Sequence, residues 1–221
     1  MGSGDQEEYM VWSTHDLLQI SEMADVVCVG GEQFPLWAKV SLEIAPFVVV
    51  RRANPIRGMI PIGIRGLWRN QRFAGYLVPD SVLKRVTPEQ LTESHSSRGN
   101  AQRESIPALN TWAEMQVELS NFSLAYGPTG SVGFELASGL STATAASDLD
   151  LLIRTPERLS MESARKLMAI FSQSACRLDV QLETPGGAVC LAEYASGQRP
   201  LLLRQNGGPV LIDDPWAALR E

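Results

Sequence analysis

Short runs of apolar residues, partly in alternation with polar ones, dominate residues 1–91. Residues 46–53 form a β-branched run, residues 58–66 alternate apolar and other positions, and residues 73–78 continue the pattern. Side chains alternate across a strand, so these runs predict strands of a small sheet, joined by Asn-Pro and glycine turns. A capping-type sequence at residues 14–18 predicts a short helix before them.

A polar stretch separates this half from a second half in which apolar and polar positions follow a different pattern. Residues 92–104 contain few apolar residues, which predicts an interdomain linker or mobile loop. The chain therefore divides into a small β-rich N-terminal domain (1–91), the linker (92–104) and a second domain (105–221). A helix that begins at residues 105–107 carries a buried stripe at helical spacing, formed by Ala108, Trp112, Met115 and Leu119.

Strands and helices alternate in the second half, which predicts an α/β (α+β) fold with a mixed sheet and flanking helices. Strands are expected at residues 122–126, 148–154, 176–184, 201–204 and 209–212. Helices are expected at residues 131–138, from residues 155–156 onward, and through Leu191 and Tyr194 after the glycine pair at 186–187.

The charge is unevenly distributed. The formal net charge is −6, which argues against coating of a nucleic-acid polymer. Between Glu43 and Asp80, however, the chain has no acidic residue and no lysine. A cationic block in an acidic protein indicates an anionic ligand or partner, and arginine suits phosphate geometry better than lysine. Its members are Arg51, Arg52, Arg57, Arg65, Arg69 and Arg72.

Features that the sequence lacks argue against membrane-spanning, secreted, disulfide-stabilised and zinc-binding proteins. No apolar run is long enough to span a bilayer, and the N-terminus has no secretory signal, so we expect a cytoplasmic protein without a membrane partner. The three cysteines lie far apart, which supports neither a disulfide framework nor a zinc site.

The candidate chemistry lies on two predicted strands. Asp148 and Asp150 are two positions apart and point to the same face, while the intervening leucine points into the core. Two adjacent carboxylates repel each other unless they are solvated or hold a cation, and Mg²⁺ prefers carboxylate and phosphate oxygens. If the strand at 176–184 is a neighbour, Asp179 becomes a third carboxylate, as suits a phosphoryl-transfer site.

A glycine-rich turn precedes these carboxylates. Gly130 and Ser131 open a predicted helix, where small residues let the backbone approach a polyphosphate and free amides bind it. Each motif alone is weak, since turns and strand ends use both constantly. The turn lacks the Gly-Lys-Ser/Thr ending of a P-loop and does not fit the dinucleotide fingerprint.

With these residues together, the chain resembles the nucleotidyltransferase superfamily. It is similar in particular to the malonate decarboxylase holo-acyl-carrier-protein synthase family, also called phosphoribosyl-dephospho-CoA transferases. The resemblance lies chiefly in residues 127–137, 147–154 and 179–185, and extends from about His15 to Trp216.

The resemblance implies a donor, an acceptor and roles. The donor would be 2′-(5″-triphosphoribosyl)-3′-dephospho-CoA, the acceptor a serine of the acyl-carrier subunit of malonate decarboxylase, and the by-product diphosphate. Asp148 and Asp150 would hold Mg²⁺, and Asp179 would be a third ligand or the base. Gly130 and Ser131 would cradle the outer phosphates. Donor or carrier would be bound by Arg51, Arg65 and Arg72.

Two alternatives stay open at this point. The same fold could use another donor or acceptor, such as an ordinary nucleoside triphosphate or the citrate lyase carrier protein. It could also be a catalytically inactive module that binds a carrier protein, for which a missing carboxylate would be the signature. All three carboxylates are present.

Overall fold

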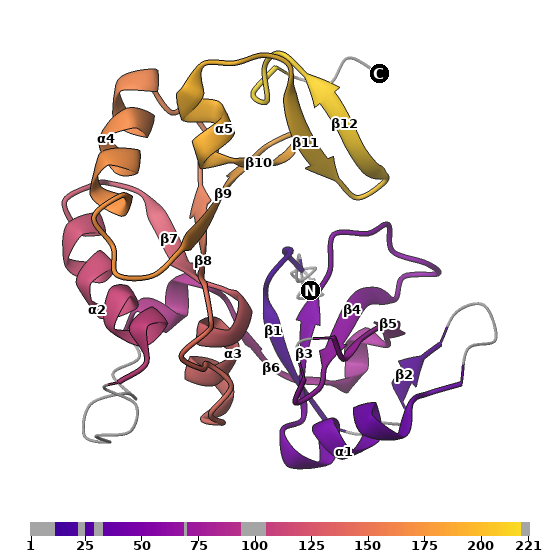
Figure 1. The fold of residues 1–221 in the computed structure, drawn as a ribbon. Helices are drawn as coiled ribbons and strands as arrows, with labels where there is room; N and C mark the ends of the chain where they lie inside the picture. The colour runs from indigo at the N-terminus through magenta and orange to yellow at the C-terminus, as the bar shows by residue number, and fades with distance from the viewer. Residues whose placement is uncertain (1–11, 22–24, 29–32, 69, 94–104, 218–221) are drawn as a thin grey trace, which may run out of the picture.

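The chain folds around two six-stranded β-sheets, one from each half of the sequence (Figure 1). The computed structural model describes residues 12–21, 25–28, 33–68, 70–93 and 105–217. The greater part of the expected linker and one member of the arginine block, Arg69, lie outside these ranges. The two sheets and their helices confirm the predicted α+β class.

The first sheet is antiparallel throughout, with the strand order β2-β5-β4-β3-β1-β6. The helix α1 (Leu36–Ile44) packs on this sheet, chiefly against β4. The strands are β1 (Leu17–Ile20), β2 (Val26–Val27), β3 (Phe47–Val50), β4 (Ile60–Arg65), β5 (Arg72–Leu77) and β6 (Val82–Val86). A short 3₁₀ helix, η2 (Pro79–Ser81), precedes β6, and another, η3 (Glu89–Glu93), follows it.

The start of the chain differs from the sequence prediction. Residues 14–18 were expected to enter a helix, but the chain turns at 13–16 and continues as β1. The buried Asp16 closes that turn: its Oδ2 accepts the backbone N–H of Ser13 at 2.9 Å and Nε–H of Arg85 at 2.7 Å. A capping aspartate and a turn-closing aspartate have the same local sequence, so the helix prediction was wrong.

The second sheet is mixed, with the order β12-β11-β10-β9-β8-β7 and one parallel pair, β8 with β9. The strands are β7 (Ala125–Pro128), β8 (Leu149–Arg154), β9 (Leu178–Thr184), β10 (Gly187–Cys190), β11 (Leu201–Gln205) and β12 (Gly208–Ile212). The helices are α2 (Pro107–Leu119), α3 (Gly130–Ser138), α4 (Met161–Phe171) and α5 (Leu191–Ser196). Figure 1 shows α2 and α4 on the side of this sheet away from the first sheet.

Most predicted elements of the second half are present, with three differences. The strand expected at 122–126 begins later, at Ala125. The helix α4 begins after its cap, Ser160, whose Oγ accepts the N–H of Ser163, and not at residues 155–156. Residues 187–190 form the strand β10 before α5, where only a helix was expected.

The two hydrophobic cores meet along β1. Adjacent residues of a strand point to opposite faces. Leu18 therefore belongs to the core of the first sheet, while Leu17 belongs to the core built by the second sheet and its helices. A ring contact between Phe47 of β3 and Phe134 of α3, with centroids 6.4 Å apart, joins the halves at another point. No helix in the described part of the chain is long and apolar enough to cross a membrane.

Candidate active site

The glycine turn and the carboxylate strand are in direct contact. Gly130 begins α3 with a φ of 57°, the left-handed region, and a Cβ at this position would overlap with Oδ2 of Asp150. The backbone supports the same approach, because the N–H of Thr129 donates to the carbonyl of Asp150 at 2.9 Å. Only glycine allows the start of α3 to lie this close to the carboxylate.

The three carboxylates lie where the parallel strands β8 and β9 begin. Leu149 and Leu151 are buried on the opposite face, so Asp150 faces outward as its alternation predicted. Asp179 is the direct register partner of Asp150. Burial raises the pKa of Asp150, and the charges of Asp179 and Asp148 raise it further. The condition on which Asp179 was expected to join the other two carboxylates, a strand adjacent to that of Asp150, is therefore met.

The three carboxylates alone do not form a preformed metal-binding site. Among the described residues, no group of three histidine, cysteine, aspartate or glutamate side chains has metal-binding geometry. The pKa of Asp150 is nonetheless raised, first by burial and then by repulsion from Asp179 and Asp148, and a bound cation would relieve that repulsion. Mg²⁺ is commonly held by one or two carboxylates together with water and substrate phosphates. The donor set at Asp148 and Asp150 fits that mode of binding.

A buried glutamate fixes the loop that leads into Asp148. Oε2 of Glu135, on α3, accepts the N–H groups of Thr142 at 2.8 Å and Ala143 at 2.9 Å. The hydroxyl of Thr142 in turn donates to the carbonyl of Ser131 at 2.8 Å. These bonds tie the loop to the helix whose first turn contacts Asp150, so both sides of the candidate site are held by one element.

A cleft of about 1070 Å³ lies between the two sheets and contains most of the predicted site. Residues of both halves line it. Charges of Arg65 and Arg72 lower the pKa of Asp150, against the larger effects that raise it, which places both guanidinium groups within electrostatic reach of the carboxylates. The predicted residues that line the cleft are Gly130, Asp148, Asp150, Asp179, Arg51, Arg65 and Arg72.

Two residues of the predicted set are placed differently. Ser131 is buried and is not among the residues lining the cleft, so only its backbone is available at the start of α3. Arg57, a member of the arginine block, is exposed on a turn away from the cleft. The block is therefore split between the cleft and the outer surface.

One arginine of the block bridges the halves. Arg52 donates to both carboxylate oxygens of Glu183, at 2.8 and 2.6 Å, and the two side chains are only 14% and 19% exposed. The sequence offered no acidic partner near this arginine, because Glu183 is far away along the chain. A largely buried bidentate pair of this kind fixes one side of the cleft relative to the other.

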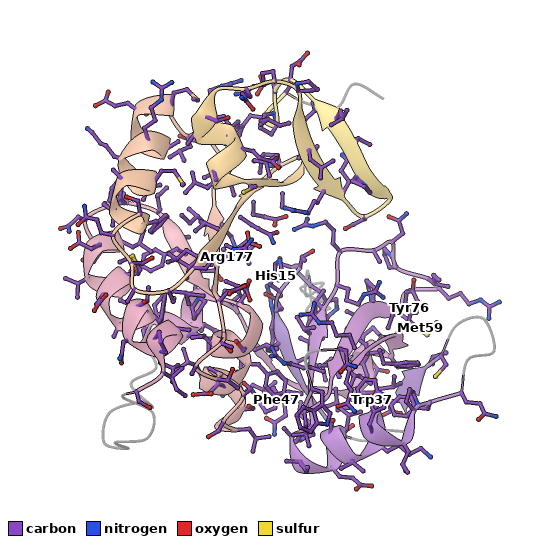
Figure 2. All side chains as sticks on the ribbon, viewed as in Figure 1. His15, Trp37, Phe47, Met59, Tyr76 and Arg177 are labelled. Atoms are coloured by element: carbon purple, nitrogen blue, oxygen red, sulfur yellow. The ribbon has the colours of Figure 1, made fainter. Side chains whose placement is uncertain are left out.

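His15 is a cleft residue that the sequence did not assign to the site. It has a φ of 75°, unusual for a residue other than glycine, and the turn closed by Asp16 holds it there. Burial, together with the charge of Arg52, lowers its pKa to about 4. Figure 2 shows His15 facing the space between the sheets. The imidazole is therefore neutral at physiological pH.

Two further cleft arginines, Arg177 and Arg204, come from the second half. Arg177 lies two positions before Asp179, so strand alternation could have placed it on the same face. Arg204 carried no comparable signal, because the pairing of β11 with β10 that brings it to the cleft is not evident locally. Neither side chain has an ion pair among the described residues.

The start of α3 contacts a carboxylate, and paired aspartates and several arginines surround the same cleft. This arrangement is typical of enzymes that bind polyphosphate substrates and transfer phosphate-linked groups. Comparison with known families specifies the member of the class. Residues 13–88 match the phosphoribosyl-dephospho-CoA transferase MdcG N-terminal domain, and residues 95–215 match the C-terminal domain of the same family. The chain belongs to this family of transferases.

Individual relatives agree with this assignment. A phosphoribosyl-dephospho-CoA transferase of Pseudomonas fluorescens (strain Pf0-1) is 41% identical over 182 residues, covering 82% of this chain and 85% of the relative. One from Pseudomonas putida (strain GB-1) is 43% identical, covering 83% and 87%. One from Azotobacter vinelandii (strain DJ) is 41% identical, covering 82% and 85%. No solved structure matches the chain significantly.

Proposed function

We propose that this protein transfers the phosphoribosyl-dephospho-CoA group from 2′-(5″-triphosphoribosyl)-3′-dephospho-CoA to a serine of the acyl-carrier subunit of malonate decarboxylase. Diphosphate is the other product. Membership of the transferase family supports the class of group transferred. The observation that carries the proposal is the contact of Gly130 with Asp150, since a phosphate bound by the first amides of α3 lies directly beside the carboxylates.

In the proposed reaction, Oγ of the carrier serine attacks the phosphorus attached to the 5″-oxygen of the donor. The new O–P bond forms as the bond from that phosphorus to the outer diphosphate breaks, so a phosphodiester remains on the carrier and diphosphate leaves. The serine proton passes to a base. Asp179 is the candidate, because it faces Asp150 from the neighbouring strand and is partly exposed in the cleft.

Charge neutralisation comes from both sides of the cleft. Asp148 and Asp150 are the residues that would hold Mg²⁺, which when bound offsets charge on the triphosphate and on the leaving diphosphate. Arg65 and Arg72 act electrostatically on Asp150, which supports a role for both in pairing with the same phosphates. The neutral His15 adds a polar group to the cleft without adding charge.

The test is reconstitution with defined donors and carriers. The protein is incubated with the triphosphoribosyl-dephospho-CoA donor, ATP or CTP, and with the apo carrier of malonate decarboxylase or of citrate lyase. Carrier mass and released diphosphate are measured. We expect modification of the malonate decarboxylase carrier with the first donor alone. Modification confined to ATP, CTP or the citrate lyase carrier would contradict the proposal.

A matched pair of variants tests the site itself. Asp148→Asn should abolish transfer while leaving the circular dichroism spectrum unchanged, because it removes one carboxylate that faces the phosphates. Asp213→Asn, the same change at an exposed position outside the cleft, should retain full transfer. Undiminished transfer by Asp148→Asn would remove this residue from the mechanism.

A further inference from the structure

The hairpin of β11 and β12 supplies a wall of the cleft that the proposed reaction does not use. Figure 1 shows this hairpin projecting from the second sheet on the side of the first sheet. Leu202 and Arg204 lie two positions apart on β11, so they share a face, and both line the cleft. Pro209, the direct partner of Arg204, lines it too. One cationic side chain is therefore accompanied by two apolar ones.

Strand register places Arg204 on the same face of the sheet as the carboxylates. Arg204 pairs with Ala188 of β10, and Ala188 pairs with Glu183 of β9. Directly paired residues of neighbouring strands lie on one face, so Arg204 shares the face of Glu183. Glu183 in turn shares a face with Asp179, because they are four positions apart on one strand.

The same register separates Arg204 from the carboxylates. Four positions along β9 correspond to about 13 Å, and two strands across correspond to about 10 Å. Arg204 is thus too far from Asp179 to contact the same phosphate group. A ligand that reaches both must be elongated and must carry anionic groups at two separate places.

The guanidinium of Arg204 is available for such a ligand. It is half-buried, and no ion pair of this side chain is found within the described ranges. The nearby Arg52, in contrast, is fully engaged by Glu183. A partly desolvated arginine with no carboxylate partner favours a phosphate ligand, which it binds through two parallel N–H groups.

We infer that the β11–β12 hairpin binds the dephospho-CoA arm of the donor, with Arg204 on the internal diphosphate and Leu202 and Pro209 against the adenine. The identity of the donor rests on the proposed function. That donor carries a triphosphate and, beyond two ribose rings, the diphosphate of the dephospho-CoA moiety. The cleft has the corresponding order: carboxylates with Arg65 and Arg72 at one end, and the hairpin at the other.

The test uses two probes that each carry one half of the donor. Dephospho-CoA contains the diphosphate and adenine without a triphosphate, and inorganic tripolyphosphate contains only the other anion. Their dissociation constants are measured by calorimetry for the wild-type chain, Arg204→Gln, Arg204→Lys and Arg72→Gln. Arg165→Gln, the same loss of charge at an exposed position on α4, is the matched control.

We expect Arg204→Gln to weaken dephospho-CoA binding about ten- to hundredfold, the range for loss of charge-assisted hydrogen bonds, with tripolyphosphate binding unchanged. Arg204→Lys should recover part of the lost affinity, because lysine restores the positive charge but not the planar guanidinium that makes two parallel hydrogen bonds. Arg72→Gln should show the reverse selectivity. The inference is overturned if wild-type protein does not bind dephospho-CoA, or if Arg204→Gln binds it as tightly as Arg165→Gln does.

This titration is independent of the proposed reaction. It needs neither a carrier protein nor turnover, so a chain that fails to modify the malonate decarboxylase carrier would refute the proposed function and leave the binding result to decide on the hairpin. Conversely, full transfer activity together with unchanged dephospho-CoA affinity in Arg204→Gln would refute the hairpin site alone.

Discussion

Replacement of Asp150 by asparagine should have opposite effects on the stability of the fold and on transfer activity. The pKa of Asp150 is raised by burial and by Asp179 and Asp148. A carboxyl whose pKa is higher in the folded than in the unfolded chain destabilises the fold once it is ionised. The penalty is absent at low pH, where both states are protonated, and grows as the pH rises through the folded-state pKa. Asparagine keeps the shape and removes the charge.

The size of the effect follows from the register of β8 and β9. Asp150 and Asp179 are direct partners on strands that lie about 4.8 Å apart. Two unit charges about 5 Å apart repel by about 3 kcal/mol at an effective dielectric constant of about 20. Arg65 and Arg72 offset part of this repulsion. We therefore expect metal-free Asp150→Asn to be more stable than wild type by about 1–2 kcal/mol at pH 7, while transfer is lost.

Urea unfolding with a chelator present measures the stability difference, and carrier modification measures activity. Asp213→Asn, an exposed aspartate, is the control and should change neither. Added Mg²⁺ should stabilise the wild type and leave Asp150→Asn unchanged, because the variant lacks a ligand. The reasoning is refuted if the chelated variant unfolds at lower urea than wild type, since the carboxylate would then stabilise the fold.

Three further changes test other parts of the cleft. Gly130→Ala should lose transfer and more than about 1 kcal/mol of stability, measured by carrier modification and urea unfolding, because its Cβ overlaps with Asp150 at a left-handed φ. The pKa of His15 is about 4 when folded and 6.5 when unfolded, so its contribution to stability is complete above pH 6.5 and is lost as the pH falls towards 4. Between pH 7 and pH 4, urea titrations should therefore show a fall in the free energy of unfolding that is about 3 kcal/mol larger in wild type than in His15→Asn. Asparagine is the chosen replacement because it tolerates the left-handed backbone, and equal falls in the two proteins would contradict this prediction. Glu183→Gln should cost about 2 kcal/mol by leaving Arg52 half-buried without a counter-charge, and a double-mutant cycle with Arg52→Gln should give a coupling well above that of a surface pair.

The sequence was most informative where alternation and burial coincide. The strand that carries Asp150 could be predicted because buried leucines alternate with outward carboxylates, and the same pattern on the next strand identified Asp179. The facing of side chains depends only on the strand period, so it is local. Pairing of β8 with β9 is not local, so the sequence analysis could only assume it, and the structure shows that the two strands are neighbours.

The sequence was least informative where one residue type serves two purposes. The expected strand ended at residue 126, but Gly127 lies within β7, where a Cβ would overlap with the carbonyl of Pro88. Thr155 was taken as a helix start, but it is buried and donates to the carbonyl of Glu183, which keeps the chain extended. Contacts of this kind are tertiary and leave no local pattern.

The partners of the arginine block could not be predicted for the same reason. Arg52 meets Glu183 only when two separate sheets dock, and His15 reaches the cleft only because Asp16 closes its turn. The block indicated an anionic ligand or partner, which stays a prediction, and Arg65 and Arg72 line the cleft. It did not indicate that Arg52 is held in a structural ion pair and is therefore not free to bind a ligand.

The strand β1 has a consequence for how substrates reach the cleft. Its successive leucines are buried in different cores, so hinging one half away from the other would pull an apolar side chain into water at about 25 cal/mol per Å². Opening would also separate the Arg52–Glu183 pair. The aperture is thus set during folding rather than at each catalytic cycle. If the proposed reaction holds, donor and carrier bind in a preformed cleft, and little of their binding energy is needed to close it.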